Sequence, residues 1–428
     1  MEIQQTYCFM KRRNLAAKSI LLGCLSGLIA VMFRLGLEKA EEIRALLLSL
    51  LRNSYALAPS LIFAICMAII LICLKRWAPE ASGSGIPHLK GVLREGFEFR
   101  AVPVILVKFF GGIIGIGSGL ALGREGPTVQ MGAAVGSICS DFFKSNTHER
   151  NLLLCAGAGA GLASAFNAPL AGLLFILEEL QQKLDRFSLV VAFAATISAN
   201  IVCRLLLGQS PIYKLKLLAY PDLKLILWSL LFGVILGFLG LAFNRLLIKS
   251  LRVFGPVRMA LGVLLGVLFG FTGFYYPDLL GSGHRLTEHV FAGRFPLKIL
   301  FVFLIARFLL TLLSYNTGAP GGIFAPILLL GAISGGIFYN LVNLVQPGDF
   351  DLVVFLVLGM CGLFSAIVRS PLTGTVLIIE MTNEFMLLLP LMIVAIMAYA
   401  VPEFFHNKPV YDELLDVELE KRRAIDLS

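Results

Sequence analysis

Charged residues are scarce in this chain. Asp, Glu, Lys and Arg together make up 15% of its 428 residues, hydrophobic residues make up 58%, and the mean hydropathy is +0.86. Soluble domains carry about 25% charged residues, so this composition excludes an ordinary soluble fold. At about 20 residues per span, the apolar runs leave room for roughly ten or more membrane crossings. The sequence therefore predicts an all-α polytopic membrane protein.

Motifs for metal binding and hydrolytic catalysis are also missing. The eight cysteines include no CxxC pair, and His284 and His289 lack the four-residue spacing that places two metal ligands on one helix face. The chain has no HExxH and no G-x-S-x-G sequence. We therefore predict no metal, no cofactor and no enzyme activity. An intramembrane enzyme that uses Glu125 as a general acid or base is the alternative from a different class.

The net charge of +9 does not indicate a nucleic-acid partner. Lys and Arg are scattered at the ends of apolar runs and form no basic stripe. Four cations precede the first span and place the amino terminus in the cytoplasm by the positive-inside rule: Lys11, Arg12, Arg13 and Lys18. The first apolar run exceeds a signal-peptide core and has no small-residue cleavage site, so we expect it to stay as a span.

The two halves of the chain repeat each other. One block recurs at a separation of 202 positions (371 − 169), pairing Gly157, Pro169, Leu170, Gly172, Ile176 and Glu178 with Gly359, Pro371, Leu372, Gly374, Ile378 and Glu380. A second block recurs at 199 (326 − 127), pairing Gly123, Pro127, Gly132, Ala133 and Gly136 with Gly322, Pro326, Gly331, Ala332 and Gly335. Chance alignment of small residues is the alternative, since these residues favour packing between membrane helices.

The repeat predicts the domain organisation. We expect one transmembrane domain over residues 1–428, with halves at about 15–208 and 216–411, and a short cytoplasmic tail at 412–428 in which charges at helical spacing indicate a solvated helix. Duplicated halves are typical of transporters and channels whose site lies between them. The sequence alone leaves open whether the repeat is parallel or inverted.

Glu125 is an acid in an unfavourable place. It lies between glycines in the segment Gly123 to Pro127, inside a stretch otherwise apolar enough for a membrane. An acid at bilayer depth is disfavoured by roughly 2.5 kcal/mol or more unless it faces the protein interior or water. Glu125 is therefore a functional candidate, and a structural acid paired with Arg124 is the alternative.

Gly and Pro interrupt the apolar runs in four segments: Ser82 to Pro87, Gly123 to Pro127, Gly318 to Pro326 and Lys408 to Tyr411. Such breaks allow helices to begin inside the membrane, where each amino terminus presents unpaired N–H groups and about half a positive charge. Several such ends bind an anion without a full positive charge, which is weak enough for the ion to leave again. We expect an anion pathway at these breaks.

At these residues the sequence resembles the CLC family of chloride channels and chloride/proton antiporters. Four features occur in the family's order across residues 82–411: GSGIP around Ser84, GREGP around Glu125, GGIFAP from 321 to 326, and a Tyr at 411 after Lys-Pro. The resemblance implies a fold of about 18 tilted and partly re-entrant helices in two inverted repeats. It also implies a homodimer with one pore per subunit, multi-pass in the bacterial inner membrane, with both termini cytoplasmic.

The resemblance further implies how chloride is held. The hydroxyls of Ser84 and Tyr411, with the backbone amides of Ile323 and Phe324, would surround a central anion. Glu125 would be the external gate and proton acceptor, because its carboxylate occupies an anion site when charged. The alternatives are a helix N-cap for Ser84 and a residue of the interfacial aromatic belt for Tyr411.

Two neighbouring acids, Glu178 and Glu179, close an apolar helix. Glu178 recurs as Glu380 whereas Glu179 aligns with Met381, which predicts a structural role for the first acid and a functional role for the second. The resemblance makes Glu179 the internal proton acceptor. A solvated acid at a helix end is the alternative. Lys90, like Arg94, departs from the acids expected of bacterial relatives, so its local partners must differ.

These residues favour proton-coupled chloride antiport. Glu179 supplies a second proton station on the cytoplasmic side, which Glu125 alone does not reach. A passive voltage- or pH-gated chloride channel on the same fold is the alternative. Fluoride export is disfavoured by the presence of both Ser84 and Tyr411.

Overall fold

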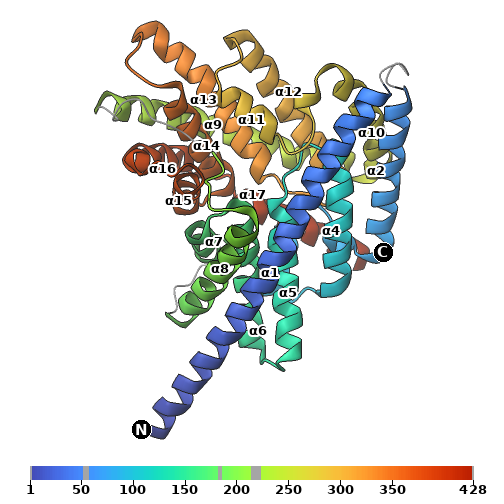
Figure 1. Cartoon of the computed structure of the whole chain (residues 1–428), viewed down its shortest axis with the longest axis vertical. Coiled ribbons are helices and arrows are strands. Elements are labelled where there is room, and N and C mark those ends of the chain that lie inside the picture. The colour runs from blue at the N-terminus through green and yellow to red at the C-terminus, as the bar shows by residue number, and fades with distance from the viewer. Residues whose placement is uncertain (1, 52–56, 182–185, 214–222, 427–428) are drawn as a thin grey trace.

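The computed structural model describes residues 2–51, 57–181, 186–213 and 223–426 (Figure 1). Helices make up nearly all of these ranges, so the all-α prediction is confirmed, and the predicted count of about 18 is approximate. The first half contains α1 (Glu2–Leu50), α2 (Leu57–Trp77), α3 (Ile86–Glu95), α4 (Ala101–Gly117), α5 (Glu125–Phe142), α6 (Thr147–Phe166), α7 (Pro169–Phe175) and α8 (Arg186–Leu207). The second half contains α9 (Leu223–Phe254), α10 (Arg258–Tyr275), α11 (His284–Phe291), α12 (Leu297–Asn316), α13 (Phe324–Val345), α14 (Leu352–Val368), α15 (Pro371–Thr382) and α16 (Leu388–Phe404), followed by α17 (Val410–Asp426).

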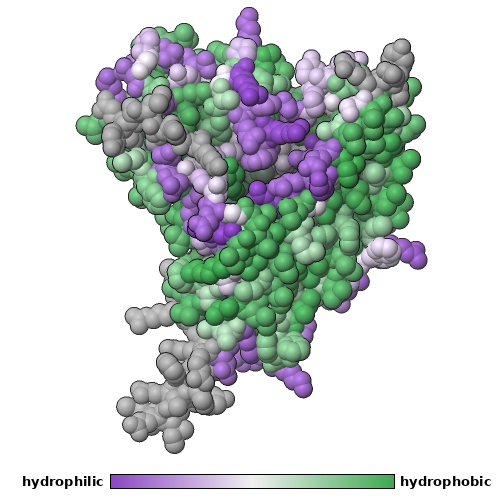
Figure 2. All heavy atoms as spheres, viewed as in Figure 1, coloured by the Kyte–Doolittle hydropathy of each residue, from purple (hydrophilic) through white to green (hydrophobic). Residues whose placement is uncertain are grey.

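The outer surface suits a lipid environment. Seven of the described helical stretches are long and apolar enough to cross a membrane, judged by length and composition. Large apolar side chains such as Leu61, Ile65 and Val302 are exposed on the outside. Figure 2 shows hydrophobic residues over much of one face, with hydrophilic residues gathered beside the upper half of α1. The chain is therefore a multi-pass membrane protein.

The recurring glycines mark the places where helices approach most closely. A Cβ atom on Gly132 of α5 would lie 2.0 Å from the carbonyl oxygen of Gly157 in α6. In the second half, a Cβ on Gly331 of α13 would lie 2.3 Å from the carbonyl oxygen of Gly359 in α14. Neither contact leaves room for a side chain, so the same small residues are required in both halves.

The helix ends follow the same repeat. Pro169 and Pro371 begin α7 and α15, where the missing N–H of proline is no loss. Asn167 and Arg369 end α6 and α14 with positive φ angles of 53° and 68°. Equivalent positions in the two halves thus adopt equivalent backbone conformations.

The carboxyl-terminal helix differs from the expectation of a solvated helix. One face of α17 is buried through Leu414, Leu415 and Val417, and the helix packs against α3 and α9. Its first turn carries Tyr411 into the protein interior. Because these apolar residues lie at helical spacing among the charges, the helix has a buried face that the charge pattern alone concealed.

Candidate functional site

Three loops that are far apart in the sequence meet at one place through backbone hydrogen bonds. The amide of Gly83 donates to the carbonyl of Gly318 at 3.1 Å, and the amide of Gly321 donates back to Gly83 at 3.0 Å. Gly123 and Gly322 exchange two bonds of 2.7 and 2.8 Å as an antiparallel bridge. The structure therefore brings the GSGIP, GREGP and GGIFAP segments together.

Tyr411 lies in this region and is fully buried. Its relative exposure is 0%, and its ring centroid lies 5.9 Å from that of Phe324. The phenolic oxygen has no hydrogen-bond partner among the described residues. A buried O–H group without a partner is costly and points to a missing acceptor. The alternative of an interfacial belt residue is wrong for Tyr411, because its ring does not reach the surface.

Ser84 is buried beside the start of α5. A Cβ on Gly126 would lie 2.9 Å from Cα of Ser84, so only glycine allows this approach. The Ser84 hydroxyl oxygen accepts long hydrogen bonds from the amide of Ile86 at 3.4 Å and from the hydroxyl of Tyr315 at 3.5 Å. Gly85, with φ of 82°, occupies the N-cap position of α3, and Ser84 precedes it, so the contact of its hydroxyl with the first amide of α3 is the only part of the N-cap alternative seen among the described residues.

Ile323 and Phe324 form the amino terminus of α13. Ile323 is its N-cap and Phe324 its first residue, and both are completely buried. Amides in the first turn of a helix have no partner within that helix, so they are available to an anion. The Phe324 ring stacks on Phe364 with centroids 5.1 Å apart, which holds this turn in place.

Glu125 is the first residue of α5, and its side chain is buried. The carboxylate lies near its own amide and near that of Ala325 in α13, so it lies where two helix amino termini meet. Its Oε2 atom would lie 2.1 Å from a Cβ on Gly123, and this oxygen has no partner among the described residues. The side chain thus takes the position that suits an anion.

Arg124 is directed elsewhere. Its guanidinium donates to the carbonyl oxygen of Ala165 at 3.1 Å, and among the described residues it forms no ion pair within 4.0 Å of the Glu125 carboxylate. The two charges interact electrostatically without direct contact, so Arg124 does not hold Glu125 as a contact ion pair.

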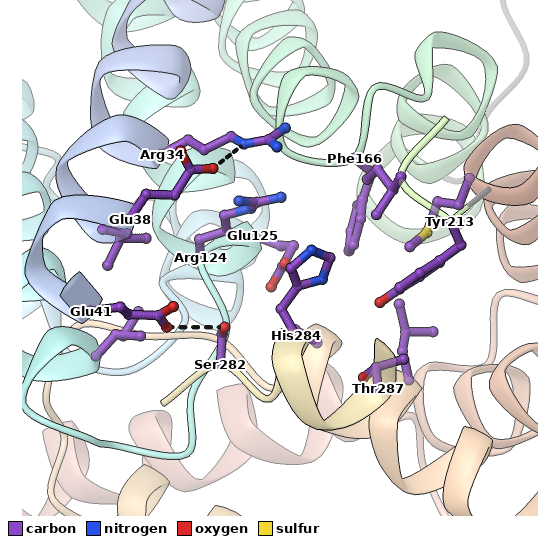
Figure 3. A pocket seen from close by; sticks show the side chains of 16 residues that line it. Arg34, Glu38, Glu41, Arg124, Glu125, Phe166, Tyr213, Ser282, His284 and Thr287 are labelled. Carbon is purple, nitrogen blue, oxygen red and sulfur yellow. Dashed lines mark hydrogen bonds and ion pairs between the residues drawn. The ribbon is translucent and has the colours of Figure 1, made fainter. Parts of the chain in front are cut away.

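A pocket of about 80 Å³, lined by both charged and apolar side chains, opens beside Glu125 (Figure 3). Arg34 and Glu38 of α1 form an ion pair of 2.8 Å on its wall, and His284 at the start of α11 lines the same pocket. The Glu125 side chain therefore borders a space that also holds charged groups.

Glu179 lies on a π-helical turn, Ile176–Gln181, and is buried rather than solvated. Its Oε1 atom accepts from the ammonium of Lys90 at 2.5 Å, and its Oε2 atom accepts from the hydroxyl of Ser370 at 3.3 Å. Lys90 also pairs with Asp412 at 2.7 Å, and Arg94 pairs with Asp412 at 2.9 Å. The alternative of a solvated helix-end acid is therefore wrong for Glu179. Lys90, as a cation in place of an expected acid, pairs with the carboxylates of Glu179 and Asp412.

Glu178 and Glu380 each cap the amino terminus of a helix in the other half of the chain. The Glu178 carboxylate accepts from the amides of Leu372 and Thr373 at the start of α15, at 3.1 and 2.7 Å. The Glu380 carboxylate accepts from the amides of Leu170 and Ala171 at the start of α7, at 3.1 and 2.9 Å. These bonds give both acids the same helix-capping geometry.

A third repeated block escaped the sequence analysis. Gly83-Ser84-Gly85 recurs as Gly281-Ser282-Gly283 at a separation of 198 (281 − 83), and all four of these glycines have positive φ. A buried cation holds each loop: Lys108 donates to the carbonyl of Gly83 at 2.5 Å, and Arg307 donates to that of Gly281 at 3.1 Å. The shared Gly-Ser-Gly sequence is the feature from which this block could have been found.

In the described ranges no group of three or more His, Cys, Asp or Glu is placed to hold a metal ion.

The sequence profile of the voltage gated chloride channel family matches residues 66–403. This match spans well over half of the chain. The chain belongs to the voltage gated chloride channel family. The resemblance seen in the sequence is thereby confirmed.

Members of the family are similar to this chain over nearly its whole length. The H(+)/Cl(-) exchange transporter ClcA of Vibrio parahaemolyticus is 39% identical, with 95% of this chain and 91% of the relative covered. ClcA of Salmonella agona is 36% identical, with 94% and 88% covered.

Solved structures agree with the CLC fold. A slow cyanobacterial Cl-/H+ antiporter superimposes with a TM-score of 0.90 at 32% identity, covering 96% of this chain and 99% of the other. A eukaryotic CLC transporter gives a TM-score of 0.81 at 23% identity, covering 96% and 74%. The latter shows the fold alone. The predicted all-helical CLC fold is confirmed by these similarities.

Proposed function

We propose that this CLC-family chain is an antiporter that exchanges chloride for protons across the membrane. Two buried carboxylates carry the proposal. Glu125 lies at the meeting of two helix amino termini, and Glu179 lies at a separate buried station beside Lys90. The Tyr411 hydroxyl lies within electrostatic range of both acids. The names of the relatives, H(+)/Cl(-) exchange transporters at up to 39% identity, support the same activity.

Chloride is bound in the centre by neutral donors. The Tyr411 and Ser84 hydroxyls donate from two sides, and the amides of Ile323 and Phe324 donate from the start of α13. The unpartnered Tyr411 hydroxyl supports this arrangement. No full charge touches the ion, so it binds and leaves readily.

Glu125 couples the two ions because its carboxylate competes with chloride for the outer anion position, beside the amide of Ala325. When it is charged, it fills this position. When it is protonated, it loses that advantage and turns towards the neighbouring pocket. Chloride binding and proton binding at one place are then linked in both directions. Glu179 supplies protons to this gate from the other side.

A passive chloride channel on the same fold is the competing function. It requires no second buried acid, whereas this chain keeps Glu179 buried between Lys90 and Ser370. The desolvation cost of a buried ion pair often exceeds its Coulombic gain, so a channel gains nothing from this arrangement. Similarity to a fluoride/proton antiporter at 22% identity bears on the fold alone. No observation favours an enzyme.

The assembly and the orientation belong to the same proposal. The chain forms a homodimer with one pore per subunit in the bacterial inner membrane, and both termini are cytoplasmic. The whole chain is one transmembrane domain, with repeat halves near 15–208 and 216–411. The similarity to bacterial ClcA proteins supports this placement. Cross-linking of the purified protein and labelling of termini in intact cells test these points.

Purified protein in liposomes tests the function directly. Chloride and pH electrodes record both fluxes while a chloride gradient is imposed with no proton gradient. We expect outward chloride flow to drive protons inward and so to build a proton gradient where none was imposed. Chloride flow without any proton movement would establish the passive channel instead.

A further inference from the structure

Lys90 links Glu179 to the cytoplasmic tail helix. Its side chain is 1% exposed, and its ammonium lies 2.5 Å from Oε1 of Glu179 and 2.7 Å from Oδ1 of Asp412. Asp412 lies in the first turn of α17, directly after Tyr411. One buried nitrogen therefore touches both a proton station and a carboxylate of the tail.

The four charged groups of this cluster, Lys90 included, balance in charge. Arg94 lies 2.9 Å from the same Oδ1 atom of Asp412, so two cations face two carboxylates. The side-chain exposures are 33% for Arg94, 24% for Asp412, 1% for Lys90 and 4% for Glu179. The cluster thus runs from a water-accessible carboxylate to a buried one, with the lysine between them.

We propose that Lys90 relays the cytoplasmic proton from Asp412 to Glu179. In the first step an N–H bond of the ammonium breaks and its proton passes to Oε1 of Glu179, which leaves a neutral amine and a neutral acid. In the second step the amine takes the proton from protonated Asp412 and becomes an ammonium again. One proton has then moved from Asp412 to Glu179, and Asp412 takes the next from water. The relay rests on the proposed antiport.

Lysine suits this task for two reasons. Its ammonium carries protons that can be transferred along a hydrogen bond, and the neutral amine that remains accepts a proton again. Both transfers run along contacts within hydrogen-bond distance, as proton transfer requires. Arginine holds the same charge but does not release its proton in proteins. The pair Lys and Arg therefore separates a relay from a merely electrostatic role.

The test compares Lys90→Arg and Lys90→Met with the wild type in the same two-electrode liposome assay. If Lys90 is a relay, both variants lose coupled proton flux by about ten-fold or more while chloride still passes. If its charge only holds Glu179 in place, Lys90→Arg keeps proton flux near the wild-type level, and the proposal is overturned. Lys224→Arg and Lys224→Met change an exposed lysine paired with Asp349 at 3.0 Å and serve as matched controls with wild-type fluxes.

Asp412→Asn provides an independent test of the relay, which remains informative if a lysine variant fails to fold. It removes the outer carboxylate and leaves the Lys90–Glu179 contact in place, so we expect proton flux to fall while chloride flux persists. Unchanged proton flux in Asp412→Asn would show that Asp412 is not the proton donor, and the proposed relay would be overturned. A wild type without any proton coupling would overturn the antiport itself, which is a different outcome from a coupled wild type with a fully active Lys90→Arg.

Discussion

Where the first half of the chain carries Glu125, the repeat offset of 199 places Phe324 in the second half (324 − 125). Where the first half carries Glu179, the offset of 202 places Met381 (381 − 179). Both acids, and the two apolar residues at the equivalent repeat positions, are buried. The two halves therefore share helix crossings and caps, but only the first has carboxylates at these positions.

This difference separates the proposed roles of the two halves. In the proposed function, both proton-carrying acids belong to the first half, whereas the chloride donors come from both: Ser84 from the first, and the amides of α13 followed by Tyr411 from the second. An exchange mechanism needs both kinds of group, and the bridge between Gly123 and Gly322 joins the loops that precede α5 and α13. Four changes break or sharpen this contrast.

The largest effect is expected from Glu125→Gln. A neutral amide neither carries a proton nor competes as an anion, so proton movement should stop while chloride flux continues. The paired electrodes described above measure both fluxes. A variant that still moves protons uphill in a chloride gradient would show that Glu125 is not the shared gate.

Glu179→Met gives the first half the residue that the second half has at the equivalent position, and Glu179→Gln keeps its shape. We expect proton movement to stop in both, with chloride still passing and no longer responding to a proton gradient. Lys90 keeps Asp412 as a partner, so the Gln variant should fold. Retained coupling in Glu179→Gln would rule out its role as the inner proton acceptor.

Ser84→Ala combined with Tyr411→Phe removes two hydroxyl donors and keeps the ring that packs on Phe324. Each hydrogen bond to a charged group contributes on the order of 1.5 to 3 kcal/mol, so chloride affinity should fall measurably by calorimetry. Tyr339→Phe, which alters a tyrosine packed against Phe355, is the control with unchanged affinity. Equal affinity in the double variant and the control would contradict the central anion site.

The smallest effect is expected from the two capping acids. Glu178→Gln and Glu380→Gln each weaken a helix cap, so each should lower stability by about 0.5 to 2 kcal/mol and by similar amounts. Thermal unfolding in detergent measures this. The ratio of protons to chloride should stay at the wild-type value in both. A changed ratio in Glu178→Gln alone would give this acid a transport role that Glu380 lacks.

Local patterns predicted much of this molecule. The glycine and proline blocks mark helix crossings and helix starts, because both require particular small or rigid residues, and the repeat places the loops around Glu125 and Phe324 together. The Lys90–Asp412 contact was not predictable in this way. Its residues lie 322 positions apart (412 − 90) in no shared motif, and their pairing depends on how α17 docks on α3.

The reciprocal caps also constrain the order in which the protein is assembled. Helix α7 has seven residues, too few to be stable alone, and its cap is Glu380, about 210 residues later in the chain. At about 5 to 20 residues per second, the ribosome needs roughly 10 to 40 seconds to reach it. Glu178, which caps α15, has by then been synthesised. The cap of α7 therefore forms only after the second half has been synthesised and has packed against the first.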